Sequence, residues 1–569
     1  MKLKRIKLAL FGMWVAILGA GCEKSEPVRS APAVTSTPAA PAAAAGETVA
    51  RVHWLGKKRL ATEATGTNFM GIWNLPTSVK LLAQTLDKLS VAPWRPATGD
   101  SAVKNTAAGN TNIAATLTNA AAAKFRPLLD DMVSEESFLE VRQLTNQTGE
   151  VVFAIRLSEE RSRLWETNLA SVFESLTTLR PVPATGDRPG WSLKQPRWPQ
   201  LVELTRAGEW TVVGAAAQQN SLLGETLARI QRDHAPVAAP GSNIWFEADV
   251  DLARAAKALV LDWKIPAEWP RVSLTLSSKG ENVLTRGTLN FAQPLPFELE
   301  AWNIPTNLIH EPLAGFTAMR GVSSWLSGLR IWNDLQLGPP PKQLFLWSLD
   351  GVPMETYFAA AMPDTAKTFD QLTARLLGEG NAWLATTKMG KFQSSNGVTA
   401  WTTTPFATPQ MQVFTNDTCS YLMGGFIQLA ESPDPLAAEL YNAVTNLPNL
   451  VYYDWEYTAA RTEKWIYLSQ WLRLVLQKPQ LPLTAGLTWL KEAGPRLGNC
   501  ATRITRTGPR QLELARSSSC GFTGVELHLL VDWLESPDFP HGLYSLTAPL
   551  ETLDDPTAPV PADPPGGLK

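Results

Sequence analysis

Two pairs of carboxylates are the residues best suited to chemistry in this chain. Glu247 and Asp249 lie two positions apart in IWFEADVD, and Asp454 and Glu456 lie two positions apart in VYYDWEYT. Side chains two apart on a strand share a face, with Cα atoms about 6.5 Å apart. Such a pair could supply the acid and base of glycoside hydrolysis or bind a divalent cation. The competing interpretation is a solvated strand face, which the sequence favours because two identical active sites in one chain would be unusual.

Other signals for catalysis or cofactor binding are weak. The histidines are scattered, and the sequence contains no HExxH, Walker A or dinucleotide-binding motif. Short matches to GxSxG at Gly321 and to SxxK at Ser101 lack the companion motifs of those enzyme classes. We therefore expect no metal and no cofactor, and an enzyme is the less favoured class.

Three cysteines follow residue 22, and the sequence does not decide whether two of them form a disulfide. Cys500 and Cys520 flank a predicted hairpin that turns at Gly508 and Pro509. A disulfide is possible there if the chain is exported, and two free thiols are the alternative. Cys419 aligns with Trp210 in the internal comparison described below, so we expect it to be a buried, unreactive thiol.

Tryptophan is unusually frequent, with 22 Trp against 8 Tyr. Most of these residues fall at positions typical of helix cores and are expected to pack. Trp191 and Trp198 differ, because they lie in a polar, proline-rich stretch. They are weak candidates for rings that contact a glycan or a hydrophobic ligand.

The elements that would position these residues indicate an α+β fold with an internal duplication. Two stretches repeat the same order of predicted strands and helices, and residues 244–251 align with 451–458 in apolar pattern, carboxylates and helix-capping residue. We predict two homologous antiparallel sheet-plus-helix units in tandem, at 137–300 and 342–535. A helical prelude (48–136) packs on this body, a helical connector (301–341) joins the units, and a final strand covers 525–533.

The N-terminus predicts export. Basic residues precede an apolar stretch from Leu8 to Leu18, and small residues then lead to Cys22. This order is typical of a signal peptide, here 1–21. The segment resembles the lipobox of bacterial lipoproteins, a resemblance confined to residues 1–22. It implies cleavage before Cys22 and acylation of that cysteine, and Glu23 in place of Asp favours the outer membrane over the inner one.

The remaining segments fit a tethered globular body. Residues 22–47 are rich in Ala and Pro and predict a disordered tether that reaches up to about 80 Å, and residues 536–569 predict a tail that is disordered at its end. The formal charge is −2, and removal of four basic residues with the signal peptide makes it about −6. This charge argues against nucleic acid as a partner. No later segment is apolar enough to span a membrane, so the body should be soluble.

These observations predict a lipid-anchored envelope protein of scaffold or binding type. The membrane would be reached through the lipid, and the partner would be an envelope protein, a glycan or a lipid. Two alternatives remain open: an envelope hydrolase that uses the paired carboxylates, and a carrier that holds an apolar ligand in a Trp-lined cavity.

Overall fold

A computed structural model gives the architecture of the chain. It describes residues 46–544 except for 64–65, 95–110, 145–148, 185–188, 196–197, 218–219, 239–240, 242, 260–268, 297, 328–331, 333–337, 351–354, 388, 403–407, 417–418, 427–435, 476–483, 537–538 and 541–542. The predicted signal peptide, Cys22, most of the tether and the end of the tail lie outside these residues.

All described strands belong to one antiparallel sheet. The strands of the first half are β1 (Glu47–Trp54), β2 (Ser137–Gln143), β3 (Gly149–Arg156), β4 (Val182–Pro183), β5 (Gly190–Gln195), β6 (Trp198–Ala207), β7 (Trp210–Ala216), β8 (Ile244–Asp251), β9 (Arg271–Lys279) and β10 (Asn282–Asn290). Those of the second half are β11 (Leu313–Arg320), β12 (Gln343–Leu349), β13 (Thr356–Ala361), β14 (Lys391–Ser395), β15 (Val398–Thr402), β16 (Gln410–Thr415), β17 (Ser420–Gly425), β18 (Leu450–Tyr457), β19 (Asn499–Gly508) and β20 (Gln511–Ser518).

The two halves of the sheet have the same strand order. In the first half the neighbours run β4-β5-β6-β7-β3-β2-β1-β8-β9-β10. In the second they run β14-β15-β16-β17-β13-β12-β11-β18-β19-β20. β10 pairs with β20, so the sheet is continuous across the middle of the molecule.

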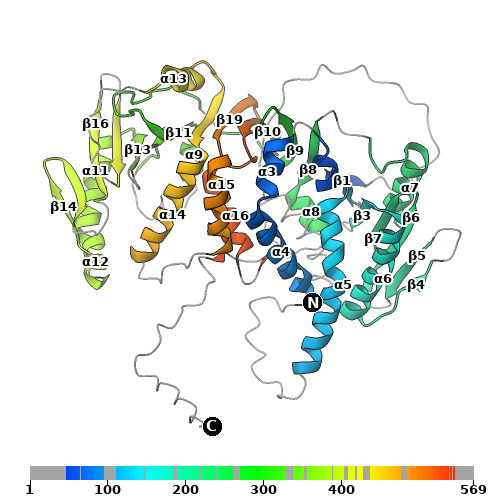
Figure 1. The fold of residues 1–569 in the computed structure, drawn as a ribbon. Coiled ribbons are helices and arrows are strands. Elements are labelled where there is room, and N and C mark those ends of the chain that lie inside the picture. Colours follow the sequence, from blue (N-terminus) through cyan, green and yellow to red (C-terminus); the bar gives the residue numbers. More distant parts are fainter. Residues whose placement is uncertain are drawn as a thin grey trace, which may run out of the picture.

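A row of helices lies against one face of this sheet, whereas the helices at Ser221–Asp233 and Ala438–Thr445 pack against the other face. The helices are α2 (Lys57–Leu60), α3 (Thr67–Trp73), α4 (Pro76–Val91), α5 (Thr111–Ser134), α6 (Glu159–Thr177), α7 (Ser221–Asp233), α8 (Leu252–Ala258), α9 (Ser323–Ser327), α11 (Thr365–Arg375), α12 (Asn381–Thr387), α13 (Ala438–Thr445), α14 (Thr458–Val475), α15 (Ala485–Ala493) and α16 (Gly524–Leu534). Neighbours in the row pack in the order α6-α5-α4-α15-α16-α14 (Figure 1). Among the described residues, no helix combines the length and apolar character that crossing a membrane requires.

Local signals account for several helix starts. Ser158, Asp251 and Asp364 accept hydrogen bonds from backbone N–H groups in the first turns of α6, α8 and α11, as the sequence predicted. Pro76 occupies the first turn of α4. Proline lacks a backbone N–H, and in the first turn that group would have no acceptor within the helix. The predicted α+β class is therefore confirmed at the level of helices combined with an antiparallel sheet.

Several elements differ from the sequence prediction, and β4, β5, β14 and β15 are among the strands that it did not contain. Residues 525–533 were predicted as a strand, but they form α16, because Thr523 and Glu526 make a capping box that starts a helix there. β1 and β11 were not predicted at all. Each pairs on both sides, β1 with β2 and β8 and β11 with β12 and β18.

Candidate functional site

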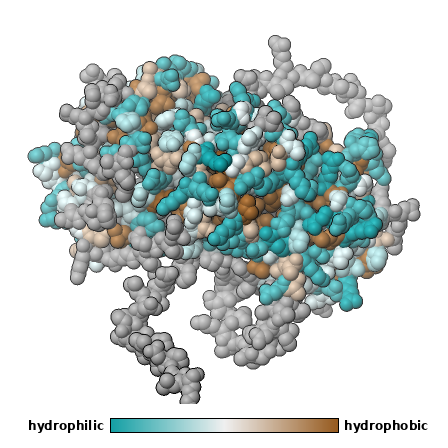
Figure 2. All heavy atoms as spheres, in the orientation of Figure 1, coloured by the Kyte–Doolittle hydropathy of each residue, from teal (hydrophilic) through white to brown (hydrophobic). Residues whose placement is uncertain are grey.

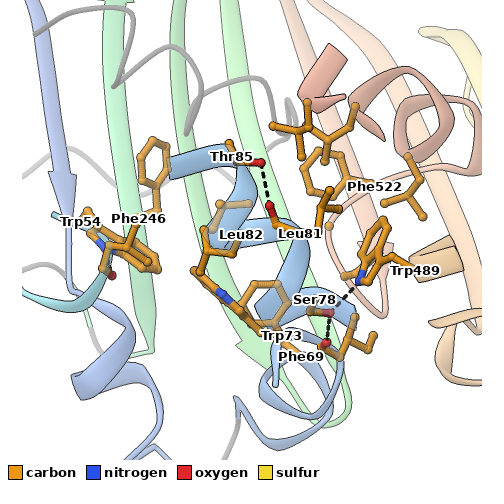
Figure 3. A pocket seen from close by; sticks show the side chains of 18 of the residues that line it. Trp54, Phe69, Trp73, Ser78, Leu81, Leu82, Thr85, Phe246, Trp489 and Phe522 are labelled. Carbon is orange, nitrogen blue, oxygen red and sulfur yellow. Dashed lines mark hydrogen bonds between the residues drawn. The ribbon is translucent and has the colours of Figure 1, made fainter. Parts of the chain in front are cut away.

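A cavity of about 320 Å³ lies between the helix row and the first half of the sheet. Its walls come from β1, β8, β9 and β10 below, from α3, α4 and the end of α5 above, and from α15, α16 and the loop before α16 at one side (Figure 3). The lining residues are Trp54, Phe69, Ile72, Trp73, Ser78, Leu81, Leu82, Thr85, Leu86, Leu89, Leu129, Met132, Val133, Trp245, Phe246, Leu276, Val283, Trp489, Cys520, Gly521, Phe522, Leu527, Leu530 and Leu534.

Aromatic rings form one end of the cavity. Trp54 and Trp73 stack with ring centroids 5.9 Å apart, and Phe69 meets Trp73 edge-on at 5.3 Å. Phe69 also lies 5.2 Å from the ring of Trp245. Rings in offset or edge-on contact hold one another in place, so this end is a rigid apolar wall.

Polar atoms of Ser78, Thr85 and Trp489 in the wall are bonded within the protein, whereas the buried indole N–H of Trp245 has no hydrogen-bond partner among the described residues. Ser78 Oγ donates to the carbonyl of Ile72 at 2.6 Å and accepts from Trp489 Nε1 at 2.6 Å, which links α4 to α15 (Figure 3). Thr85 Oγ1 donates to the carbonyl of Leu81 at 2.8 Å. None of the lining residues carries a charge. The cavity therefore offers apolar contact and suits an apolar ligand.

The cavity reaches the surface near α3 and α4. Phe69, Trp73 and Leu82 line it and are only partly buried. In Figure 2, hydrophobic residues gather near the middle of the side that faces the viewer, where α4 and α16 lie in Figure 1. Val79 on α4 and Leu529 on α16 are about half exposed, at 50% and 49%.

A buried charged cluster lies behind the α16 wall. Asp454 and Glu456 on β18 are 6% and 2% exposed, so they do not form the solvated strand face that the sequence favoured. Thr317 Oγ1 donates to Asp454 at 2.5 Å, and the backbone N–H of Gly524 donates to Glu456 at 2.5 Å. Arg461 Nε lies 3.9 Å from the Glu456 carboxylate.

Burial changes the acidity of both carboxyl groups in this cluster. It raises the pKa of Glu456 to about 7, and the neighbouring charge of Asp454 adds to the rise. It also raises the pKa of Asp454, against the hydrogen bond from Thr317. Both groups therefore tend toward the neutral form at a pH where exposed carboxyl groups are ionised.

The same cluster holds the cavity wall in place. Arg516 donates to the carbonyl of Gly521 at 2.9 Å and makes a bidentate pair with Glu526 at 2.6 and 2.8 Å. Ser518 Oγ accepts from the N–H of Gly521 at 2.7 Å. Since Gly521 lines the cavity and Gly524 begins α16, this wall depends on hydrogen bonds to buried charged groups.

The two carboxylate pairs lie on opposite faces of the sheet, which corrects the predicted equivalence. Cross-strand partners share a face. The row of partners that runs across the sheet is Trp54, Phe246, Leu276, Thr285, Arg516, Thr502 and Asp454. Phe246 therefore shares the face beneath the helix row with Asp454, whereas Glu247 points to the other face, opposite His53 and Thr275.

Asp249 belongs to a surface ion pair. Arg271 donates to it at 2.7 and 2.8 Å, and Ser273 donates at 3.2 Å. Burial opposes ionisation of this carboxyl group, but the bonds from Arg271 prevail and leave the pKa of Asp249 below its ordinary value. Neither carboxylate pair lines the cavity.

Trp191 is a core residue, which contradicts its predicted role at a binding surface. It is 5% exposed, meets Phe173 edge-on and donates from Nε1 to the carbonyl of Glu166 at 3.0 Å. Its position in β5 turns the ring inward despite the polar neighbours. Trp198 begins β6, and its side chain lies outside the described part of the structure.

Cys500 and Cys520 are buried free thiols in the structure, which is the second of the two alternatives that the sequence left open. Cys520 belongs to the loop after β20 and lines the cavity, whereas Cys500 lies opposite Glu456. Burial raises the pKa of Cys520 to about 12 and that of Cys500 well above its ordinary value. Cys419 is half-buried, and burial raises its pKa also. Thiols with raised pKa values are poor nucleophiles.

Metal ligands and known relatives do not define the site. Within the described ranges, no three His, Cys, Asp or Glu side chains are grouped to hold a metal ion. No family model, curated protein or solved structure matches the chain. The interpretation of the site therefore rests on its own residues.

Proposed function

We propose that this protein is a lipid-anchored protein of the bacterial envelope that binds an apolar ligand, such as the acyl chain of a lipid, in the cavity between α4 and the sheet. The single observation that carries the proposal is a cavity of about 320 Å³ whose lining contains four tryptophans and no charged side chain. It supports the carrier among the alternatives that the sequence left open.

The size of the cavity favours a bound ligand over a packing defect. Protein interiors are close-packed, with few voids larger than a water molecule. An apolar cavity of roughly 150 Å³ binds benzene, and this one is about twice as large. At about 24 cal/mol per Å³, leaving this volume unfilled forfeits at most roughly 8 kcal/mol of packing. A ligand recovers part of that energy.

The hydrolase alternative receives less support. Asp454 and Glu456 are bonded to Thr317 and Gly524 behind the cavity wall. Glu247 and Asp249 lie on the opposite face of the sheet, and Asp249 is paired with Arg271. A substrate in the cavity would meet none of these carboxylates.

We also propose that the two halves arose by duplication and that, within the predicted helical prelude (48–136), the segment after β1 is a helical addition to the first half. The equal strand order of the halves and their junction at β10 and β20 support this. β1 and β11 would then begin the two units, which extends the predicted boundaries. α2 to α5 lie between β1 and β2, whereas α9 alone occupies the described part of the interval between β11 and β12. The added helices build the roof of the cavity.

Binding of 1-decanol, measured by titration calorimetry on the full mature protein, tests this function. Leu82→Trp places an indole at the cavity edge and should weaken binding by at least about tenfold, because it occupies the ligand's volume. Val79→Trp adds the same ring to an exposed position of the same helix and should leave affinity within about twofold. Equal binding by both variants and the unaltered protein would refute the cavity as the binding site.

A further inference from the structure

A positively charged group lies at the aromatic end of the cavity. The ammonium of Lys57 on α2 is 5.3 Å from the centroid of the Trp73 ring. Trp73 lines the cavity, stacks on Trp54 and is partly exposed, so Lys57, although it is not a lining residue itself, lies beside a ring at the edge of the cavity. A cation held over an indole face is attracted by the ring and stays close to it.

Lys57 differs from the two basic residues that follow it. Lys58 is paired with Glu135, and Arg59 lies 3.3 Å from a carboxylate oxygen of Glu136. No carboxylate among the described residues lies within ion-pair distance of Lys57. Its burial lowers the pKa of the ammonium, and no nearby acidic group offsets that effect.

The lining of the cavity contains no charged side chain that could pair with a charged headgroup, and the polar groups of Ser78, Thr85 and Trp489 are bonded within the protein. An amphiphile would therefore place its chain inside and its headgroup at the edge. A partly desolvated cation without a carboxylate partner at that edge binds an anionic oxygen better than a neutral one.

From this arrangement, and resting on the proposed function, we propose that the ligand is a single-chain amphiphile with an anionic oxygen headgroup and that Lys57 binds the headgroup. The chain lies against Trp54, Trp73 and Leu82, and the carboxylate or phosphate lies beside the ammonium. A fatty acid and an alkyl phosphate share this chemistry.

Three ligands with the same chain test the inference on the full mature protein: decanoate, decyl phosphate and 1-decanol, each titrated at pH 8. Lys57→Gln should weaken the binding of one or both anions by roughly three- to tenfold and leave 1-decanol within about twofold. The anion that is affected identifies the headgroup. High salt should reduce the difference in anion affinity between the parent and Lys57→Gln, because salt screens an exposed charge.

Lys58→Gln provides the matched control, since it removes a neighbouring charge that is already paired and should change none of the three affinities. Urea unfolding establishes that both variants fold like the parent. If Lys57→Gln weakens all three ligands equally, or none of them, the headgroup inference fails while the cavity remains a binding site. If the unaltered protein binds none of the three, the proposed function fails as well.

Discussion

At the scale of single residues, burial raises the pKa values of the neighbouring carboxyl groups of Asp454 and Glu456. They lie two positions apart on one strand, within reach of Arg461 and Arg516. Burying a charge is unfavourable unless partners compensate for it. Here the compensation is incomplete, because the pKa of Glu456 is raised by burial and by Asp454. The pair therefore links the stability of the protein to pH.

The direction of this link follows from the two pKa values. Glu456 has a pKa of about 7 when folded and 4.5 as its ordinary value, so between these pH values the folded state binds the extra proton. Its contribution to stability is complete below pH 4.5 and is lost as pH rises through 7. Between pH 5 and pH 8, we expect the free energy of unfolding of the parent protein to fall by on the order of 3 kcal/mol. Glu456→Gln should not show this fall, because glutamine does not ionise. Urea unfolding at both pH values measures it, and the same decrease in parent and variant would contradict this assignment.

At the scale of elements, α16 connects the charged cluster to the cavity. Its N-terminus is fixed by the capping box of Thr523 and Glu526, and its residues Leu527, Leu530 and Leu534 line the cavity. Arg516 ties the preceding loop to the sheet through the carbonyl of Gly521. The position of this helix therefore sets the shape of one wall.

Removing the cap should loosen that wall. Thr523→Ala deletes the side-chain acceptor and should lower the free energy of unfolding by about 1 kcal/mol. It should also speed the release of bound 1-decanol, which stopped-flow tryptophan fluorescence can follow. Thr523→Ser keeps the hydroxyl and serves as the control. An alanine variant as stable as the serine variant would show that the cap does not hold α16.

The elements also show what the sequence could and could not predict. Hairpins and capped helices follow from local signals, and the predicted hairpin around Gly508 is confirmed as β19 and β20. In residues 525–533, alternating apolar residues predicted a strand, whereas Thr523 and Glu526 form a capping box, and Leu527, Leu530 and Leu534 have the helical spacing that the structure shows. β11 lies in the segment 301–341, which was predicted as a helical connector, and its Gly315 lies beneath the side chain of Arg461.

The cavity could not be predicted from any single segment. Trp54, Trp245 and Trp489 belong to three distant parts of the chain, and each alone is indistinguishable from a core tryptophan. The amphipathic pattern of α4 was visible, with Leu82, Leu86 and Leu89 on one face. The sequence of α4 does not show that this face covers β8, β9 and β10 and leaves space above them unfilled.

At the scale of the whole molecule, a single sheet joins two similar halves, and the described helices that roof the cavity, α3, α4 and α5, belong to the first half. In the proposed envelope setting, the predicted tether after Cys22 would keep this body within about 80 Å of a bilayer that contains candidate ligands. Anchoring and binding would then be separate properties, because Cys22 is not among the residues that line the cavity.

That separation can be measured. Cys22→Ser should move most of the protein from the membrane fraction to the soluble fraction. The variant cannot be acylated at this position, and acyl chains provide the affinity for the membrane. The substitution should leave the affinity for 1-decanol within about twofold of the parent. A variant that stays with membranes would contradict lipid anchoring at this cysteine.

The most direct test of the central claim is mass spectrometry of ligands that remain bound to the full mature protein after gentle extraction. A bound ligand with a single alkyl or acyl chain should accompany the parent and Val79→Trp and be absent from Leu82→Trp. A parent protein that carries no such molecule, and that also fails to take up 1-decanol when it is supplied, would contradict a ligand-binding role for the cavity.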